Sequence, residues 1–181
     1  MRQLFAALAF AALTALALPA AAQEAPRLDA ATKAHLVAAT KLRDGGTNLD
    51  TLGSKPTLVV FFASWCGSCA RQFQELAHYF DEDGRDAVDV VGVNWLEEMA
   101  GTDEARMARM LARIDPGVAV LSGNADIDRA FGEVGSVTGV YLFDAEGKLV
   151  LQVGGMLGPS GRHFLPRDRL RAMLAKMAGA A

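Results

Sequence analysis

A Cys-X-X-Cys pair lies between a strongly apolar run and an amphipathic repeat, and this junction restricts the possible folds more than any other feature. The run Thr57–Phe62 (TLVVFF) is rich in β-branched and aromatic residues, which is typical of a strand buried on both faces. Apolar residues then recur at helical spacing, namely Phe73, Leu76, Ala77 and Phe80. We therefore expect a buried strand, a turn that carries the cysteines, and a helix from about Cys66 to Phe80.

Strands and helices are expected to alternate along the rest of the chain. Further strands are predicted at Val88–Val93, Val118–Leu121, Val140–Phe143 and Lys148–Val153, the last two flanking a turn at 144–147. Helices are predicted around Asp29–Thr40 and in three apolar stripes: Met107, Met110, Leu111 and Ile114; Ile127, Ala130, Phe131 and Val134; Leu170, Met173, Leu174 and Met177. This order predicts an α/β fold, a three-layer sandwich in which helices cover both faces of a central mixed β-sheet.

Turn and capping residues predict two local details. Lys41–Leu52 is expected to hold two short extended pieces around the turn Gly45-Gly46. Thr102 is expected as the N-cap of the helix that follows it, because acidic residues come directly after it.

The first 22 residues have the composition of a secretory signal. Arg2 precedes an apolar run from Leu4 to Leu18, and small residues lead to a cleavage-like site after Ala22. A membrane anchor is the alternative, but a span needs about 20 apolar residues and this run is shorter. We therefore expect a signal peptide at 1–22 and an exported, periplasmic domain at 23–181, with an N-terminal helical extension at about 27–40.

Composition and charge exclude several classes of protein. With 51% hydrophobic and 22% charged residues, the chain is expected to bury a core, unlike collagen-like or disordered chains. The net charge of −3 comes without long runs of like charge, so we expect no nucleic-acid partner. Two cysteines are too few for a disulfide scaffold, which indicates a chemical role for them. We expect a monomer.

The expected position of the two cysteines predicts different reactivities for them. Their spacing lets the sulfurs meet across one turn and form a disulfide. Cys66 is expected at the helix start, where unpaired N–H groups and the helix dipole favour the thiolate over the thiol. Cys69 is expected one turn deeper, where it keeps its proton. We therefore expect exposed Cys66 to attack a partner disulfide and buried Cys69 to resolve the mixed disulfide.

Two other uses of the cysteine pair explain the pattern less well. A zinc site needs further ligands, but the chain has no second cysteine pair, and its histidines (His35, His78 and His163) are scattered. An inert structural disulfide would close a very short loop, which restricts the unfolded chain little. We therefore expect no metal and no cofactor besides the redox-active Cys66–Cys69 disulfide, and we expect the histidines on the surface.

Several segments resemble one family. Phe61–Cys69 (FFASWCGSC) resembles the F-W-A-S-W-C-x-x-C core of thioredoxin-like proteins. Val90–Asn94, Val137–Lys148 and Gly154–Met156 resemble further segments of the TlpA/ResA/DsbE-type branch, whose members are exported thiol–disulfide oxidoreductases. The resemblance covers about 41–177 and implies a thioredoxin-like fold, client protein thiols or disulfides as substrates, and a membrane electron donor or acceptor as partner. It also implies a set of supporting residues around the cysteines: Trp65, Gly67, Ser68, Val137 and Thr138.

Thr138 departs from the family pattern, because the family has a cis-proline at this position. A cis bond before a non-proline residue costs about 2.5–4 kcal/mol, so we expect a trans Val137–Thr138 peptide or an altered loop. The Thr138 hydroxyl either hydrogen-bonds the Cys66 thiolate, which would lower the pKa of that thiol, or points to solvent.

Two acidic positions of the family are also replaced. Val60 and Gln72 stand where relatives carry acids near the second cysteine, and Glu75 lies too far along the helix to be assumed a substitute. The sequence therefore predicts a specialised rather than a general thiol–disulfide oxidoreductase. A thioredoxin-fold binding or redox-sensing module with weak catalysis is the alternative.

Overall fold

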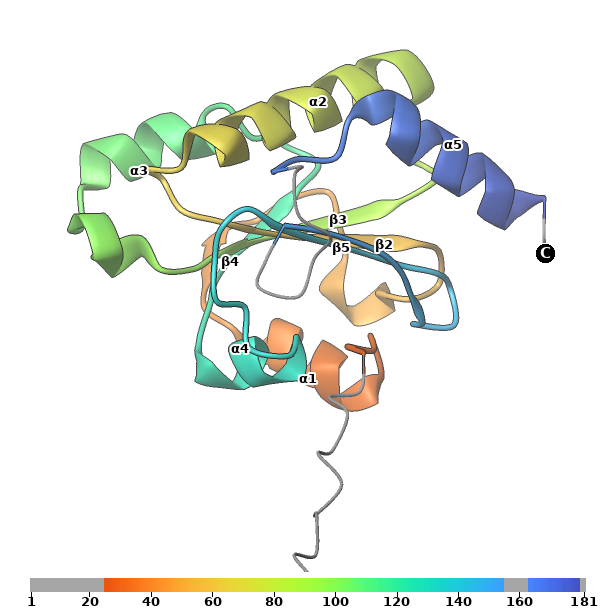
Figure 1. Cartoon of the computed structure of the whole chain (residues 1–181), viewed down its shortest axis with the longest axis horizontal. Coiled ribbons are helices and arrows are strands. Elements are labelled where there is room, and N and C mark those ends of the chain that lie inside the picture. Colours follow the sequence, from red (N-terminus) through yellow and green to blue (C-terminus); the bar gives the residue numbers. More distant parts are fainter. Residues whose placement is uncertain (1–24, 155–162, 180–181) are drawn as a thin grey trace, which may run out of the picture.

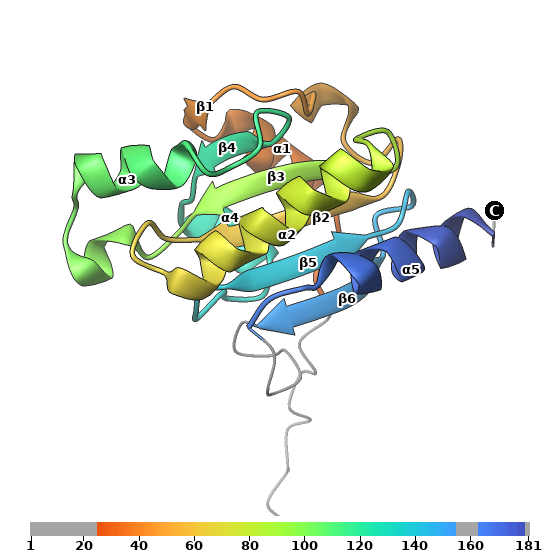
Figure 2. The same cartoon turned by 90° about the horizontal axis from the view of Figure 1, so that it is seen from above.

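A six-stranded sheet forms the centre of the molecule, in the order β1-β4-β3-β2-β5-β6 (Figure 2). The computed structural model describes residues 25–154 and 163–179. Its strands are β1 (Lys41–Arg43), β2 (Thr57–Phe62), β3 (Asp89–Asn94), β4 (Ala119–Ser122), β5 (Gly139–Phe143) and β6 (Leu149–Gly154). β2, β3 and β4 run parallel, whereas β1, β5 and β6 join antiparallel, so the predicted mixed sheet is confirmed.

Helices cover both faces of this sheet (Figure 1). They are α1 (Ala30–Ala38), α2 (Gly67–Asp83), α3 (Glu104–Leu111), α4 (Ala125–Ala130) and α5 (Arg167–Ala178), together with the 3-10 turns η1 (Leu49–Thr51) and η2 (Glu97–Ala100). α2, α3 and α5 pack on one face, and α1 and α4 pack on the other. The predicted three-layer α/β sandwich is confirmed. Within the described ranges, no helix combines the length and the apolarity needed to cross a membrane.

β2 lies in the middle of the sheet and contributes side chains to both halves of the core. Leu58, Val60 and Phe62 pack on the side of α2 and α5, and Val59 and Phe61 pack on the side of α1 and α4. All five side chains are fully buried, as the continuous apolar run predicts. Burial of each large apolar side chain contributes about 1.5–3 kcal/mol, so the strand that leads to the cysteines is held from both sides.

The parallel pairing of β2 and β3 brings two loops to the same edge of the sheet. The strands are in register, and Phe62 at the end of β2 lies opposite Asn94 at the end of β3. Binding and catalytic groups of open α/β sheets gather at the carboxyl ends of parallel strands. Here that edge carries Cys66 after β2 and Glu97 after β3.

Two local predictions are wrong. The second extended piece before β2 is the turn η1 instead, because the Asn48 side chain accepts a hydrogen bond from Asp50 N at 3.0 Å. Asp103 rather than Thr102 caps α3, since its carboxylate accepts a hydrogen bond from Arg106 N at 2.9 Å.

The predicted N-terminal helix is present as α1, capped by the Asp29 side chain. The predicted signal peptide at 1–22, and residues 155–156 of the segment compared with the family, lie outside the described residues.

Candidate active site

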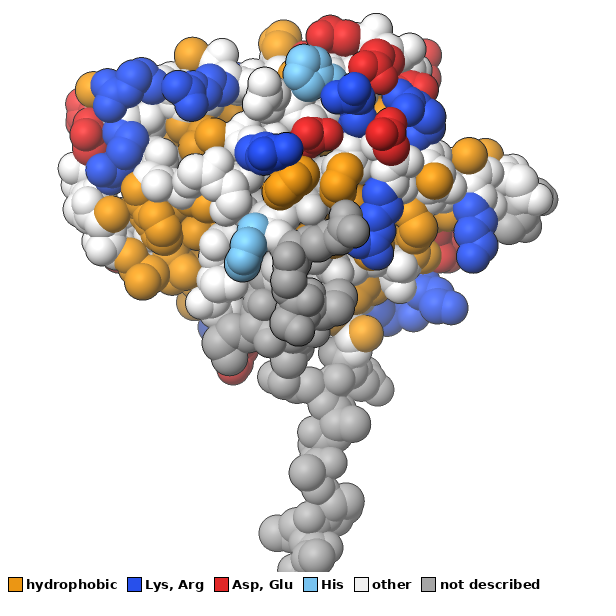
Figure 3. Space-filling view, turned by 45° about the horizontal axis from the view of Figure 1, so that its top comes forward, with side chains coloured by type: hydrophobic (Ala, Val, Ile, Leu, Met, Phe, Trp, Pro, Cys, Tyr) orange, Lys and Arg blue, Asp and Glu red, His pale blue; other side chains and the backbone are white. Residues whose placement is uncertain are grey.

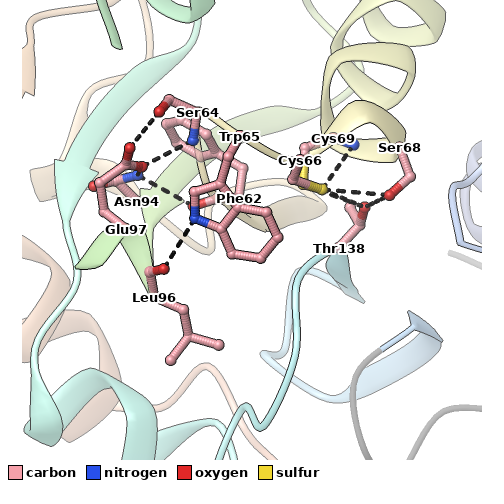
Figure 4. Close-up of a disulfide and its surroundings, with 10 residues drawn as sticks. All are labelled: Phe62, Ser64, Trp65, Cys66, Ser68, Cys69, Asn94, Leu96, Glu97 and Thr138. Atoms are coloured by element: carbon pink, nitrogen blue, oxygen red, sulfur yellow. Dashed lines mark hydrogen bonds between the residues drawn. A yellow bond between two sulfur atoms is a disulfide. The ribbon is translucent and has the colours of Figure 1, made fainter. Parts of the chain in front are cut away.

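Cys66 and Cys69 form a disulfide at the start of α2, with an S–S distance of 2.11 Å. Cys66 is the N-cap residue and lies just outside the helix, which begins at Gly67. The backbone N–H of Cys69 donates a hydrogen bond to Cys66 Sγ over 3.2 Å (Figure 4). Because an N–H group at a helix N-terminus points at this sulfur, the position favours a thiolate when the pair is reduced.

The two cysteines differ less in exposure than the sequence suggested. Cys69 is fully buried, and Cys66 is also buried at 6% exposure, so the expectation of an exposed Cys66 is wrong. The reason is tertiary, since the buried residue Thr138, which directly precedes β5, lies against the disulfide. Cys66 is still the more accessible of the two.

Two hydroxyl groups lie next to the sulfurs (Figure 4). Thr138 Oγ1 lies 3.4 Å from Cys69 Sγ and 3.7 Å from Cys66 Sγ. The same hydroxyl donates a hydrogen bond to Ser68 Oγ over 2.9 Å, and Ser68 Oγ lies 3.3 Å from Cys66 Sγ. The Thr138 hydroxyl therefore points to the cysteines and not to solvent.

The Val137–Thr138 peptide bond is cis, so the expected trans bond is wrong. Tertiary packing outweighs the intrinsic preference for trans, because Thr138 is buried between the disulfide and the end of β6. Gly154, with φ 68°, lies so close to the Thr138 carbonyl that no Cβ fits there. Gly154 therefore allows β6 to approach the loop, and Gly139 pairs with it at the start of β5.

A second polar cluster holds the loop that precedes the cysteines. Glu97 accepts hydrogen bonds from Ser64 N at 2.8 Å, from the Ser64 hydroxyl, and from Asn94 Nδ2 at 2.8 Å (Figure 4). Arg106 donates to Ser64 Oγ at 2.9 Å and lies 3.6 Å from the Glu97 carboxylate. Burial raises the pKa of Glu97, but these hydrogen bonds and the Arg106 charge together hold it below its ordinary value. The ionised carboxylate thus ties the loop after β3 to the loop after β2.

Trp65 joins the same two loops beside Cys66. Its indole Nε1 donates a hydrogen bond to the Leu96 carbonyl over 3.1 Å, and its half-buried ring packs against the core that contains both cysteines. Trp65, one of the predicted supporting residues, therefore links the cysteine turn to the loop that follows β3.

Comparison with known proteins identifies a family with which this chain shares most of its length. The Redoxin family model matches residues 21–155. This chain belongs to the Redoxin family. No curated protein matches it. Family membership and the Cys66–Cys69 disulfide together confirm the predicted reaction class of this redoxin, thiol–disulfide oxidoreduction.

Solved structures similar to this redoxin share its fold. A secreted disulfide oxidoreductase of Mycobacterium tuberculosis, described as homologous to E. coli DsbE, has 18% identity and a TM-score of 0.53, over 71% of this chain and 87% of that one. An exposed lipoprotein thioredoxin of Streptococcus pneumoniae has 24% identity and a TM-score of 0.54, over 77% and 99%. StoA from Bacillus subtilis has 13% identity and a TM-score of 0.50, over 66% and 81%. The predicted thioredoxin-like fold is confirmed.

The positions at which the sequence lacks the family's acids serve packing in this redoxin. Val60 is fully buried in the core half that contains Cys69. The fully buried Gln72 amide accepts a hydrogen bond from Leu165 N at 2.6 Å and donates one to Leu165 O at 3.3 Å. Glu75 accepts a hydrogen bond from the backbone N–H at the start of α5. In the described part of the chain, no carboxylate hydrogen-bonds either sulfur.

The remaining predicted positions lie around the pair without bonding to it. Gly67 is exposed, and Val137 is half-buried between the two core halves.

The three histidines lie outside the buried core: His78 and His163 are exposed, and His35 is half-buried. Across residues 25–154 and 163–179, no group of three or more His, Cys, Asp or Glu side chains is placed to hold a metal ion.

Sequence reasoning missed the role of Glu97 and Arg106. One signal was available, because Glu97 lies in the loop three residues after the end of a buried parallel strand, at the same edge as the cysteines. Arg106 gave no such signal, since an arginine on an amphipathic helix is expected to face solvent.

Proposed function

We propose that this protein is an exported enzyme that reduces, or exchanges, disulfides in client proteins through Cys66 and Cys69. The observation that carries the proposal is the position of Cys66 Sγ at the start of α2, where it accepts a hydrogen bond from Cys69 N. This environment stabilises a thiolate, which is the nucleophile in thiol–disulfide exchange.

The reaction needs two exchange steps. The Cys66 thiolate attacks one sulfur of the client disulfide, a Cys66–client bond forms as the client S–S bond breaks, and the released client sulfur takes up a proton. Cys69 then loses its proton and attacks Cys66 Sγ, so the Cys66–Cys69 disulfide forms and the second client thiol leaves. Two electrons pass to the client, and a membrane electron donor restores the dithiol. The reverse sequence oxidises a client and needs an acceptor.

Thr138 and Ser68 take supporting roles in this proposal. The Ser68 hydroxyl lies 3.3 Å from Cys66 Sγ and can donate a hydrogen bond to a thiolate there. The Thr138 hydroxyl lies 3.4–3.7 Å from the two sulfurs and donates to Ser68 Oγ, which leaves the Ser68 proton for the thiolate. Trp65, Gly67 and Val137 shape the surface around Cys66. No metal or organic cofactor takes part, because the disulfide itself carries the electrons.

The proposed location is the periplasm, reached through the signal peptide at 1–22. The composition of that segment supports it, and similar structures come from proteins described as secreted or as an exposed lipoprotein. We propose a monomer that acts on client proteins and not on nucleic acid.

An insulin-disulfide reduction assay with a dithiol reductant tests the proposal. The protein is expected to accelerate insulin reduction, and Cys66→Ala is expected to abolish the acceleration. Cys69→Ala is expected to accumulate mixed disulfides with client proteins, because attack is intact and resolution is missing. If the protein is inactive on insulin and Cys69→Ala traps no client, the binding or redox-sensing module becomes the better description.

A further inference from the structure

Three arginines of α3 and its last turn border the disulfide. Arg106 and Arg109 lie one turn apart in α3, and Arg113 lies in the turn that follows the helix. Together with Trp65 and Cys66 they line a pocket of about 150 Å³. We call the surface formed by these three arginines the arginine surface. Figure 3 shows Lys and Arg side chains gathered at the upper left, where α3 lies, next to apolar side chains.

The arginines differ in how their charge is used. Arg106 bonds to Ser64 and lies 3.6 Å from Glu97, so its charge is compensated. Arg109 and Arg113 are exposed, and in the described part of the chain neither forms an ion pair. The pKa of Asp103, which caps α3, lies below its ordinary value, because its carboxylate accepts a hydrogen bond from Arg106 N and because the charges of Arg106 and Arg109 act in the same direction. Two exposed positive charges without an ion-pair partner among the described residues therefore remain beside the pocket.

Both ends of α3 are anchored, which fixes the arginine surface relative to the cysteines. Arg106 bonds to Ser64, two residues before Cys66. At the other end, Arg43 of β1 donates four hydrogen bonds of 2.7–3.1 Å to backbone carbonyls, including those of Leu111 and Ile114. The helix that carries Arg109 is thus held in place next to the reacting sulfur, which lowers the ordering cost of recognition.

We propose that the arginine surface docks an acidic segment of the client protein, adjacent to the client cysteine that reacts with Cys66. The inference rests on the proposed function. Charge complementarity supports it, because Arg109 and Arg113 are exposed beside Cys66 and have no ion-pair partner among the described residues. The pocket is also smaller than the about 300–1,000 Å³ usual for small-molecule sites, so it fits side chains of a docked polypeptide better than a free ligand.

Three disulfide peptides that differ only in the two residues beside one cysteine (Glu, Gln or Lys) test the docking. The reduced protein is expected to reduce the Glu peptide about tenfold faster than the Gln peptide at low salt, with the Lys peptide slowest. About 0.5 M salt is expected to bring the three rates together, because it screens exposed charges. The double variant Arg109→Gln/Arg113→Gln is expected to lose the preference, whereas Arg129→Gln on α4 is expected to keep it.

The possible results separate this inference from the proposed function. Equal rates on the Glu and Gln peptides would refute the docking proposal but not the proposed enzymatic function. The same conclusion would follow if the double variant kept its preference for the Glu peptide, even if the variant were less stable. If glutathione disulfide is reduced as fast as the Glu peptide, the proposal that the partner is a polypeptide is also refuted. If no peptide is reduced, the proposed function fails. Docking is then tested by the binding of cysteine-free peptides, measured by tryptophan fluorescence. At least fivefold tighter binding of the Glu peptide than of the Gln peptide would support docking, and equal binding would refute it.

Discussion

The hydroxyl oxygen of Thr138 lies 3.4 Å from the sulfur of Cys69, although the two residues are 69 positions apart in the sequence. The proline that the family pattern carries at this position has neither an N–H group nor a side-chain hydroxyl. Threonine therefore adds a hydrogen-bonding group to the inner side of the disulfide. No carboxylate bonds to the sulfurs in the described residues, so this hydroxyl and that of Ser68 are the polar side-chain groups that the described structure places on them.

Thr138→Val is expected to raise the pKa of the Cys66 thiol, because the substitution keeps the β-branched shape and removes the hydroxyl that donates to Ser68 Oγ and thereby directs the Ser68 proton to the thiolate. Thiolate absorbance against pH in the reduced protein measures the change. Ser68→Ala, which removes the other hydroxyl, is expected to change the pKa in the same direction. An unaltered titration curve in Thr138→Val, with the fold intact, would leave Thr138 a purely structural replacement.

Cys66 is expected to react with iodoacetamide at least about tenfold faster than Cys69 in the reduced protein at neutral pH. The reasons are its position at the start of α2 and the complete burial of Cys69. Mass spectrometry of peptides from a time course gives both rates. Equal rates, or faster labelling of Cys69, would contradict the assigned roles.

Gln72→Glu is expected to destabilise the protein by about 1–3 kcal/mol at pH 7, because the amide donor to Leu165 O would be replaced by a buried carboxylate. Burial raises the pKa of such a carboxyl in the folded state, so the loss is small in acid and grows as the pH rises through the unfolded-state pKa. Urea unfolding at pH 4.5 and 7 measures this dependence. Gln74→Glu, exposed on the same helix, is the control and is expected to change little.

Glu97→Gln is expected to reduce the free energy of unfolding by about 1–3 kcal/mol at pH 7, since the charged hydrogen bonds to Ser64 and Asn94 are weakened. The pKa of Glu97 is lowered in the folded state, so its contribution is complete above the unfolded-state pKa and disappears as the pH falls through the folded-state pKa. Denaturant unfolding across pH 3–7 follows it. Glu98→Gln, a substitution at the exposed neighbouring residue, is the control. If the two substitutions had equal effects on the free energy of unfolding, the hydrogen bonds of Glu97 would make no specific contribution to stability.

Local sequence was sufficient for the elements that carry the cysteines. The apolar run of β2 and the helical spacing in α2 are properties of neighbouring residues, so strand, turn and helix were predictable from them. The same holds for the order of elements, which restricts the architecture to a mixed sheet between two layers of helices. Capping was less predictable, as Asp103 shows, because adjacent polar residues compete for the same backbone N–H groups.

Tertiary structure alone decided what surrounds the sulfurs. Thr138 meets the disulfide because β5 lies beside β2, and Glu97 meets Ser64 because β3 lies on the other side of β2. The cis Val137–Thr138 bond also could not be predicted from the local sequence, because a non-proline residue prefers trans. Thr138 is buried, and Gly154 of β6 lies against its carbonyl. Contacts between loops far apart in sequence depend on strand order and register, and no pattern within a single segment contains that information.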